Sequence, residues 1–118
     1  MNGDVSGDLP SPPQDQTISG FCPVYHRAIE IIGRRWTGAV VRALLSGDRR
    51  FCQIRSTIPG LSDRLLSERL KELESEGIVD RLVLDGNPPR VQYLLTQKGM
   101  ALEPALDSLK SWARTWLD

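Results

Sequence analysis

The chain of 118 residues is long enough to bury one core but too short for two ordinary domains. Its apolar and charged fractions are those of a globular protein. No apolar run approaches the length of a membrane span, and the N-terminus lacks the basic start and apolar core of a signal peptide. We therefore expect a cytoplasmic protein whose two cysteines are reduced thiols and form no structural disulfide.

The formal net charge is zero, but the charge is distributed unevenly. Residues 1–20 contain three acids and no base, and their Pro, Gly, Ser and Asp content predicts a disordered leader before one domain over residues 21–118. Residues 27–69 contain nine arginines and four acids, a net charge of +5. Arginine suits bidentate contacts with phosphate and guanine, so this segment favours a nucleic-acid partner. For many of these arginines, solvation or pairing with glutamates is the alternative.

Two helices are expected at the start of the domain. Pro23 suits the first position of a helix, and Gly33 suits its C-terminal cap. The apolar positions of this helix are Val24, Ala28, Ile31 and Ile32. Trp36, expected to be a packing anchor, opens a second helix that ends at residues 46–47. Both helices are interpreted as core scaffold.

The stretch 50–77 has the pattern of a helix-turn-helix, in which two helices are joined by a Pro-Gly turn. Residues 52–58 are expected to form the first helix, with Ile54 and Ile58 facing inward. A small strand fits residues 49–51 just before it. This unit is the candidate for reading DNA.

Ser62 is placed as the N-cap of the second helix, which Gly77 ends. Leucines at i, i+4 and i+7 are expected to face the core: Leu66, Leu70 and Leu73. This geometry leaves a mixed acidic and basic face outside, formed by Asp63, Arg64, Ser67, Glu68 and Lys71. Only this outward face is then available to read bases.

After Gly77 the apolar period changes to two, which predicts strands over residues 78–84 and 91–95. Residues 85–90 contain Gly-Asn and two prolines, which suits a turn with a stiff return arm. A helix-turn-helix followed by such a hairpin is a winged helix. Arg90 at the base of this wing is placed to meet the backbone or minor groove of DNA.

A last helix is expected from the cap Thr96 to about Leu117, and Pro104 should kink it or split off its first turn. Its large apolar residues form a stripe: Leu102, Leu106, Leu109, Trp112 and Trp116. So many large side chains near a terminus favour a dimer interface, and coverage of the chain's own core is the alternative. The predicted fold is mainly α with a small β-hairpin wing, a winged helix-turn-helix with an added C-terminal dimerisation helix.

Several short motifs occur in one order over residues 21–117. They are Cys22-Pro23, Ile32-Gly33-Arg34-Arg35-Trp36, Arg50-Phe51, Pro59-Gly60-Leu61-Ser62, Leu66, Leu70, Leu73-Glu74, Gly77-Ile78-Val79-Asp80-Arg81, Pro88-Pro89-Arg90-Val91, Tyr93, Leu95-Thr96 and Gly99. In this order and spacing the chain resembles the HxlR-type winged-helix transcriptional regulators, distant relatives of the MarR type. The resemblance implies a homodimeric, sequence-specific bacterial DNA-binding protein that represses or activates a neighbouring gene.

Three positions depart from the pattern of that family. Arg34-Arg35 stand where Gly-Lys is common before the tryptophan. Gln53 stands where an acid usually follows the Arg-Phe pair, and Gln92 stands where a glutamate usually precedes the wing tyrosine. These changes remove negative charge near the expected DNA side, so family contacts at these positions are not carried over.

No catalytic or metal site is predicted, and no cofactor. The chain lacks a Gly-rich phosphate loop, and the lone His26 has no partner set for acid–base chemistry. Cys22 and His26 are four residues apart, but only Cys52 remains as a further soft ligand, and zinc sites normally need three or four. We expect His26 on the surface and Cys52 in a structural role.

Cys22 is the candidate regulatory thiol. A thiol at a helix N-cap can be stabilised as the reactive thiolate by the helix dipole and nearby arginines. In the family that the chain resembles, several members sense oxidants or electrophiles through a cysteine at this position. The alternative is a small residue that only caps the helix and packs.

We expect a homodimer that binds a pseudo-palindromic site on double-stranded DNA. The helix over residues 62–76 of each protomer would enter a major groove, and the two successive grooves lie roughly 34 Å apart. Base or adjacent phosphate contacts are assigned to Arg64, Ser67 and Lys71, near the cap Ser62. Backbone contacts are assigned to Arg50, Arg55 and Arg90. The alternatives are a winged-helix protein-interaction module that binds no DNA, and a regulator switched by an unknown small ligand.

Overall fold

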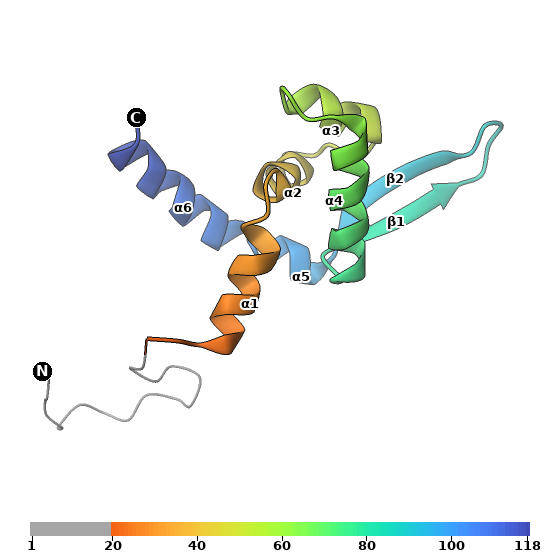
Figure 1. Ribbon diagram of the computed structural model, residues 1–118. Helices are drawn as coiled ribbons and strands as arrows, with labels where there is room; N and C mark the ends of the chain where they lie inside the picture. Colours follow the sequence, from red (N-terminus) through yellow and green to blue (C-terminus); the bar gives the residue numbers. More distant parts are fainter. Residues whose placement is uncertain (1–19) are drawn as a thin grey trace, which may run out of the picture. The chain divides into compact units, whose positions relative to one another are not determined.

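The structure of the chain, a computed structural model, describes residues 20–118 (Figure 1). The expected leader over residues 1–20 lies outside the described residues, except for Gly20. The chain divides into two units, Met1–Gly33 and Arg34–Asp118. Within residues 20–118, no helix has the length and apolar character needed to cross a membrane.

In the first unit, helix α1 (Pro23–Ile32) has the predicted ends, with Pro23 in its first turn and Gly33 as its C-cap. The prediction that α1 belongs to the core is wrong for the single chain, because none of its residues is buried. Val24 is 70% exposed, Ala28 is also exposed, and residues 31–32 are only half-buried. The physical reason is that one helix cannot cover its own apolar face, and the described part of this unit contains no other helix or strand.

The second unit is arranged around helix α2 (Thr37–Leu45), which contacts α3, α4, β2 and α6. Val40 and Val41 of α2 are completely buried. The N-cap Trp36 has a φ of 77°, and its ring lies 3.6 Å from where a Cβ would be at Gly60. The Arg35 guanidinium lies 5.2 Å from the centre of the same ring. Trp36 is therefore the predicted packing anchor, between the start of α2 and the turn of the helix-turn-helix.

Helices α3 (Phe51–Thr57) and α4 (Asp63–Ser75) form the predicted helix-turn-helix. Ile54 and Ile58 are buried, and so are the three predicted leucines of α4: Leu66, Leu70 and Leu73. Ser62 caps α4, because its hydroxyl accepts the backbone N–H of Leu65 at 3.1 Å. Gly60, with a φ of 84°, provides the left-handed turn before it, where a residue with a Cβ is strained.

The small strand expected at residues 49–51 is not formed, because Phe51 already begins α3. What remains of it is one backbone hydrogen bond, from the Tyr93 N–H to the Arg49 carbonyl, at 2.7 Å. A helix start and a strand compete for the same backbone groups, and the capping of α3 decides the outcome here. The hydrogen bond nevertheless ties the loop before α3 to the wing.

The wing consists of the antiparallel strands β1 (Val79–Leu84) and β2 (Arg90–Leu95), paired from Val79 with Leu95 to Leu84 with Arg90. Only the first residue of β1 is buried, the rest of β1 is mostly exposed, and β2 is mostly half-buried. Figure 1 shows it extending away from the helices of the second unit, next to α4. The winged helix-turn-helix predicted from the sequence is confirmed.

Pro104 splits the last helical segment as predicted, into α5 (Gln97–Met100) and α6 (Glu103–Trp116). Thr96 caps α5 through its hydroxyl, which accepts the Gly99 N–H at 3.1 Å. The first part of α6 packs on its own chain, where Leu106 is buried and Leu102 half-buried. An ion pair of 2.7 Å between Arg42 and Asp107 links α6 to α2.

Arg69 of α4 is buried, with 8% of its surface exposed, and its charge is fully used inside the second unit. Its Nε donates to the Arg35 carbonyl at 2.9 Å, and its Nη1 donates to the Glu72 carboxylate at 3.2 Å. The same carboxylate lies 3.5 Å from Arg34. Sequence reasoning counted Arg69 only as one charge of a basic segment, whereas the structure makes it an internal tie between α4 and the segment before α2.

We expect Arg69→Met to lower the free energy of unfolding by about 1–3 kcal/mol, because the Arg35 carbonyl loses a charged donor. Urea unfolding at fixed protein concentration measures this loss. Arg64→Met is the matched control, since Arg64 lies on the same helix with 89% of its side chain exposed and should change stability little. Equal stability of the two variants would contradict the assigned role of Arg69.

Candidate nucleic-acid interface

The outward face of α4 carries the predicted base-reading residues. Arg64 projects into solvent and forms an ion pair of 3.2 Å with Glu68, one turn further along. Ser67 is half-buried, and Lys71 is exposed. The hydroxyl of Ser62 is already used to cap the helix, so it contributes to this face by fixing the start of α4. An exposed ion pair contributes little free energy, so Arg64 can exchange Glu68 for another anion.

Arg55 of α3 forms an ion pair with Asp63, the first residue of α4. The pair crosses the turn of the helix-turn-helix and connects its two helices. Both side chains are about half exposed or more, so solvent screens their attraction. The structure therefore gives Arg55 a partner within the chain that sequence reasoning did not foresee.

A crevice of about 270 Å³ lies between α4 and the hairpin. Ser67 and Lys71 line it from α4, and Arg81 and Tyr93 line it from the wing, with Glu74 and Leu70 completing the wall. Arg81 was missed as a site residue. The signal for it lay in the strand pairing, because Arg81 stands opposite Tyr93 in the register and so shares a face of the hairpin with it.

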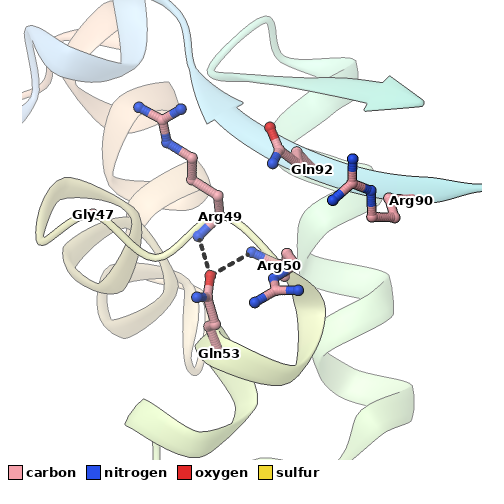
Figure 2. A pocket seen from close by; sticks show the side chains of 6 residues that line it. All are labelled: Gly47, Arg49, Arg50, Gln53, Arg90 and Gln92. Atoms are coloured by element: carbon pink, nitrogen blue, oxygen red, sulfur yellow. Dashed lines mark hydrogen bonds between the residues drawn. The ribbon is translucent and has the colours of Figure 1, made fainter. Parts of the chain in front are cut away.

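A second hollow, of about 310 Å³, lies where the start of α3 meets the base of the wing (Figure 2). Its lining residues are Gly47, Arg49, Arg50, Gln53, Arg90 and Gln92. We call this site the arginine hollow. The structure thus brings the predicted residues Arg50 and Arg90 together and adds Arg49, which sequence reasoning had not selected.

The backbone that carries two of these arginines is held on both sides. The Gln53 side-chain oxygen accepts the N–H groups of Arg49 and Arg50, each at 3.0 Å, as the dashed lines in Figure 2 show. The Arg49 carbonyl accepts the N–H of Tyr93 on β2. The loop is therefore fixed to α3 by one residue and to the wing by another.

The arginine hollow is strongly basic and contains no acid. Its lining has three guanidinium groups and two neutral amides but no carboxylate. Within residues 20–118, Arg49, Arg50 and Arg90 form no ion pair, whereas Arg42, Arg55, Arg64 and Arg69 all do. Three arginines that form no ion pair within the described residues are therefore gathered at the base of the wing.

In the first unit, Cys22 is half-buried and caps α1, since its sulfur accepts the Tyr25 N–H at 3.5 Å. His26 is exposed and lies 3.6 Å from Glu30, which agrees with the expected surface histidine. The expected structural role of Cys52 is wrong in the single chain, because this residue is exposed on α3 and fills no core position. Among residues 20–118, no cluster of three or more His, Cys, Asp or Glu side chains could hold a metal.

The residues predicted for a dimer interface fall into two groups. Leu102 and Leu106 pack against their own unit. Leu109, Trp112 and Trp116 are more than half exposed, with Trp116 at 71%. This group, which we call the α6 apolar face, leaves large side chains in water in the single chain.

Comparisons with known proteins agree on one family. The model of the HxlR-like helix-turn-helix family matches residues 31–118. YvaP of Bacillus subtilis (strain 168), an HTH-type transcriptional regulator, is 47% identical over 100 residues, which cover 85% of this chain and 93% of YvaP.

Solved structures of transcriptional regulators are also similar to this chain. The reduced form of the transcriptional regulator YodB from B. subtilis has a TM-score of 0.73 at 42% identity, over 81% of this chain and 94% of YodB. The reduced form of the redox regulator HypR has a TM-score of 0.75 at 35% identity, over 80% of this chain and 94% of HypR. YodB has also been solved in diamide-treated and quinone-bound forms.

Proposed function

The chain belongs to the HxlR-like helix-turn-helix family and is a transcriptional regulator, not an enzyme, and from this premise we propose that it acts as a homodimer on a pseudo-palindromic operator. In this proposal the regulator works in the cytoplasm on nucleoid DNA. Each protomer inserts α4 into a major groove, and the two grooves lie roughly 34 Å apart.

The observation that carries the proposal is the placement of basic side chains that form no ion pair within residues 20–118. Lys71 and Arg81 lie in the crevice between α4 and the wing. Arg49, Arg50 and Arg90 lie in the arginine hollow on the α3 side of the wing. Positive charge on both sides of a winged helix suits the phosphates that flank a groove.

The contacts divide by chemistry. Arg64, Ser67 and Lys71 on the outward face of α4 are assigned to base edges or adjacent phosphates, and Ser62 holds the start of that helix. Arg50, Arg55 and Arg90 are assigned to the DNA backbone. Glu68 and Asp63, which now pair with Arg64 and Arg55, would be displaced by phosphate, so these acids favour selectivity over affinity.

Arg64→Ala should weaken operator binding by about 1–3 kcal/mol and relax the preference at one position of the site. Arg90→Ala should weaken binding to all sequences alike and reduce the slope of log affinity against log salt by about one. Gel shifts with the DNA upstream of the regulator's own gene, in parallel with an unrelated duplex, measure both effects.

Arg114→Ala is the control for these variants, because Arg114 is an exposed arginine on α6 outside the proposed DNA interface. Unchanged operator affinity in both the Arg64 and the Arg90 variant would reject the contact assignment. Failure of the wild type to bind any duplex would instead favour a protein-interaction module.

Homodimerisation is proposed through the α6 apolar face. Leu109, Trp112 and Trp116 lie on one side of α6 at helical spacing, and large exposed aromatic residues are enriched in protein interfaces. A second copy of the chain would remove these side chains from water. Their burial would then supply the apolar core that the single chain lacks at this end.

Trp112→Glu should convert the dimer to a monomer, since it puts a charge into the centre of the α6 apolar face. Light scattering after size exclusion measures the mass. Leu82→Glu is the matched control, because Leu82 is an exposed apolar residue of the wing and its replacement should leave the mass unchanged. A dimer that persists in Trp112→Glu would place the interface elsewhere.

Regulation through Cys22 is proposed from its position at the start of α1 and from relatives whose solved forms include diamide-treated and quinone-bound YodB. Modification of the sulfur would remove the acceptor that caps α1, because the thiol accepts the Tyr25 N–H. Such a change acts on the first turn of the helix and on any contact that this helix makes in the dimer. A thiol at a helix N-terminus is also a favourable place for the reactive thiolate.

Diamide should change operator affinity severalfold in the wild type but not in Cys22→Ser. The serine hydroxyl can still accept the Tyr25 N–H, so this variant should fold normally. Cys52→Ser is the matched control and should keep the response of the wild type, although Cys52 is the more exposed thiol. Equal responses of wild type and Cys22→Ser would reject sensing at this residue.

A further inference from the structure

The arginine hollow has the chemistry of an oxyanion site beyond a general affinity for DNA. Its three guanidinium groups come from two separate segments, Arg49 and Arg50 before α3 and Arg90 on β2. In the view of Figure 2, the side chain of Gln92 lies between those of Arg49 and Arg90. Two amides and three cations therefore line one concave site, with no anion among the lining residues to compensate them.

The number of these donors favours a free phosphate group over a carboxylate. A guanidinium fork pairs with two oxygens, and a carboxylate has only two in all. A free pyrophosphate or phosphomonoester carries at least three free oxygens on a tetrahedral group and can receive donors from two segments at once. Its double or higher charge also balances the charge of the hollow better than a single carboxylate does, whereas a DNA phosphodiester offers two free oxygens and one charge.

The backbone that carries Arg49 and Arg50 is fixed before any anion enters the hollow. Gln53 accepts the N–H groups of Arg49 and Arg50, and the Tyr93 N–H donates to the Arg49 carbonyl. These backbone groups are therefore already used, and an anion would be bound by side chains alone. A fixed backbone lowers the ordering cost of gathering three like charges around one ligand.

We propose that the arginine hollow is a phosphate-binding site, formed by Arg49, Arg50 and Arg90 with the amide of Gln92. It takes a backbone phosphate of bound DNA, and a free pyrophosphate or phosphomonoester group competes for the same place. The DNA part of this inference rests on the proposed function, whereas binding of free phosphate does not.

The first experiment titrates the full chain with sodium pyrophosphate, against sodium chloride of equal ionic strength, by calorimetry and thermal unfolding. The wild type and Arg114→Gln should bind pyrophosphate and unfold at higher temperature in its presence. Arg49→Gln and Arg90→Gln should bind roughly tenfold more weakly, because each loses one charge-assisted contact. Gln92→Glu keeps every arginine but adds a negative charge to the hollow, so it should also abolish pyrophosphate binding.

The second experiment measures DNA binding of the same variants. Arg49→Gln and Gln92→Glu should reduce the affinity for the operator and for an unrelated duplex by the same factor. For Arg49→Gln the slope of log affinity against log salt should fall by about one. Pyrophosphate should displace DNA from the wild type more effectively than chloride of equal ionic strength does. A cooperative thermal unfolding transition in the absence of pyrophosphate shows that each variant is folded.

The outcomes separate the two sources of phosphate. An effect of the variants in both experiments supports the proposal as stated, and an effect in one alone identifies either free phosphate or the DNA backbone as the ligand. Folded variants that match the wild type in both experiments would overturn it. If the wild type binds no DNA, the proposed function fails. The pyrophosphate titration then still shows whether the arginine hollow binds phosphate.

Discussion

The buried guanidinium of Arg69 is the constraint on which the second unit depends. A charge without water must be paired and hydrogen-bonded, and Arg69 meets this demand with the Arg35 carbonyl and the Glu72 carboxylate. The Arg35 carbonyl directly precedes Trp36, whose positive φ is costly for a bulky residue. One side chain of α4 therefore fixes the orientation of that helix and holds the strained start of α2 in place.

In the second unit, the residues that stabilise the fold are different from the residues that are exposed to a binding partner. The inner face of α4 is fully used by its leucines and by Arg69, so the outer face can vary without affecting the core. The wing is joined to the loop before α3 by the hydrogen bond from the Tyr93 N–H to the Arg49 carbonyl, and to α4 by its buried first residue. Binding side chains are thus carried by rigid elements, which lowers the ordering cost of recognition.

Most of the fold could be predicted from local signals. The cap Ser62, the turn at Gly60, the leucine spacing of α4 and the break at Pro104 each depend on residues close in sequence. Contacts between distant segments were not predictable in this way. The burial of Arg69, the missing strand before Phe51 and the exposure of α1 all depend on which surfaces meet in three dimensions.

In the candidate site, too, local patterns were predictable from the sequence and contacts between distant segments were not. The helix-turn-helix and wing patterns placed Arg50 and Arg90 at the expected DNA side. These patterns did not predict that the two residues share a hollow with Arg49. The ion pair of Arg55 with Asp63 was missed, because a partner across the turn cannot be read from charge counts alone, whereas Arg64 and Glu68 stand four residues apart on one helix, a spacing that is visible in the sequence. Gln53 and Gln92 were noted only as neutral residues, and the structure brings both of them into the same site.

Gln53 has a consequence for how such a regulator can diverge. Its amide oxygen accepts two backbone N–H groups, a task that a glutamate oxygen of the same reach performs equally well. Exchange between the two residues would therefore preserve the loop while changing the charge beside Arg49 and Arg50. Evolution can adjust the ionic-strength range in which the protein occupies its target by a substitution at this position, without redesigning the scaffold.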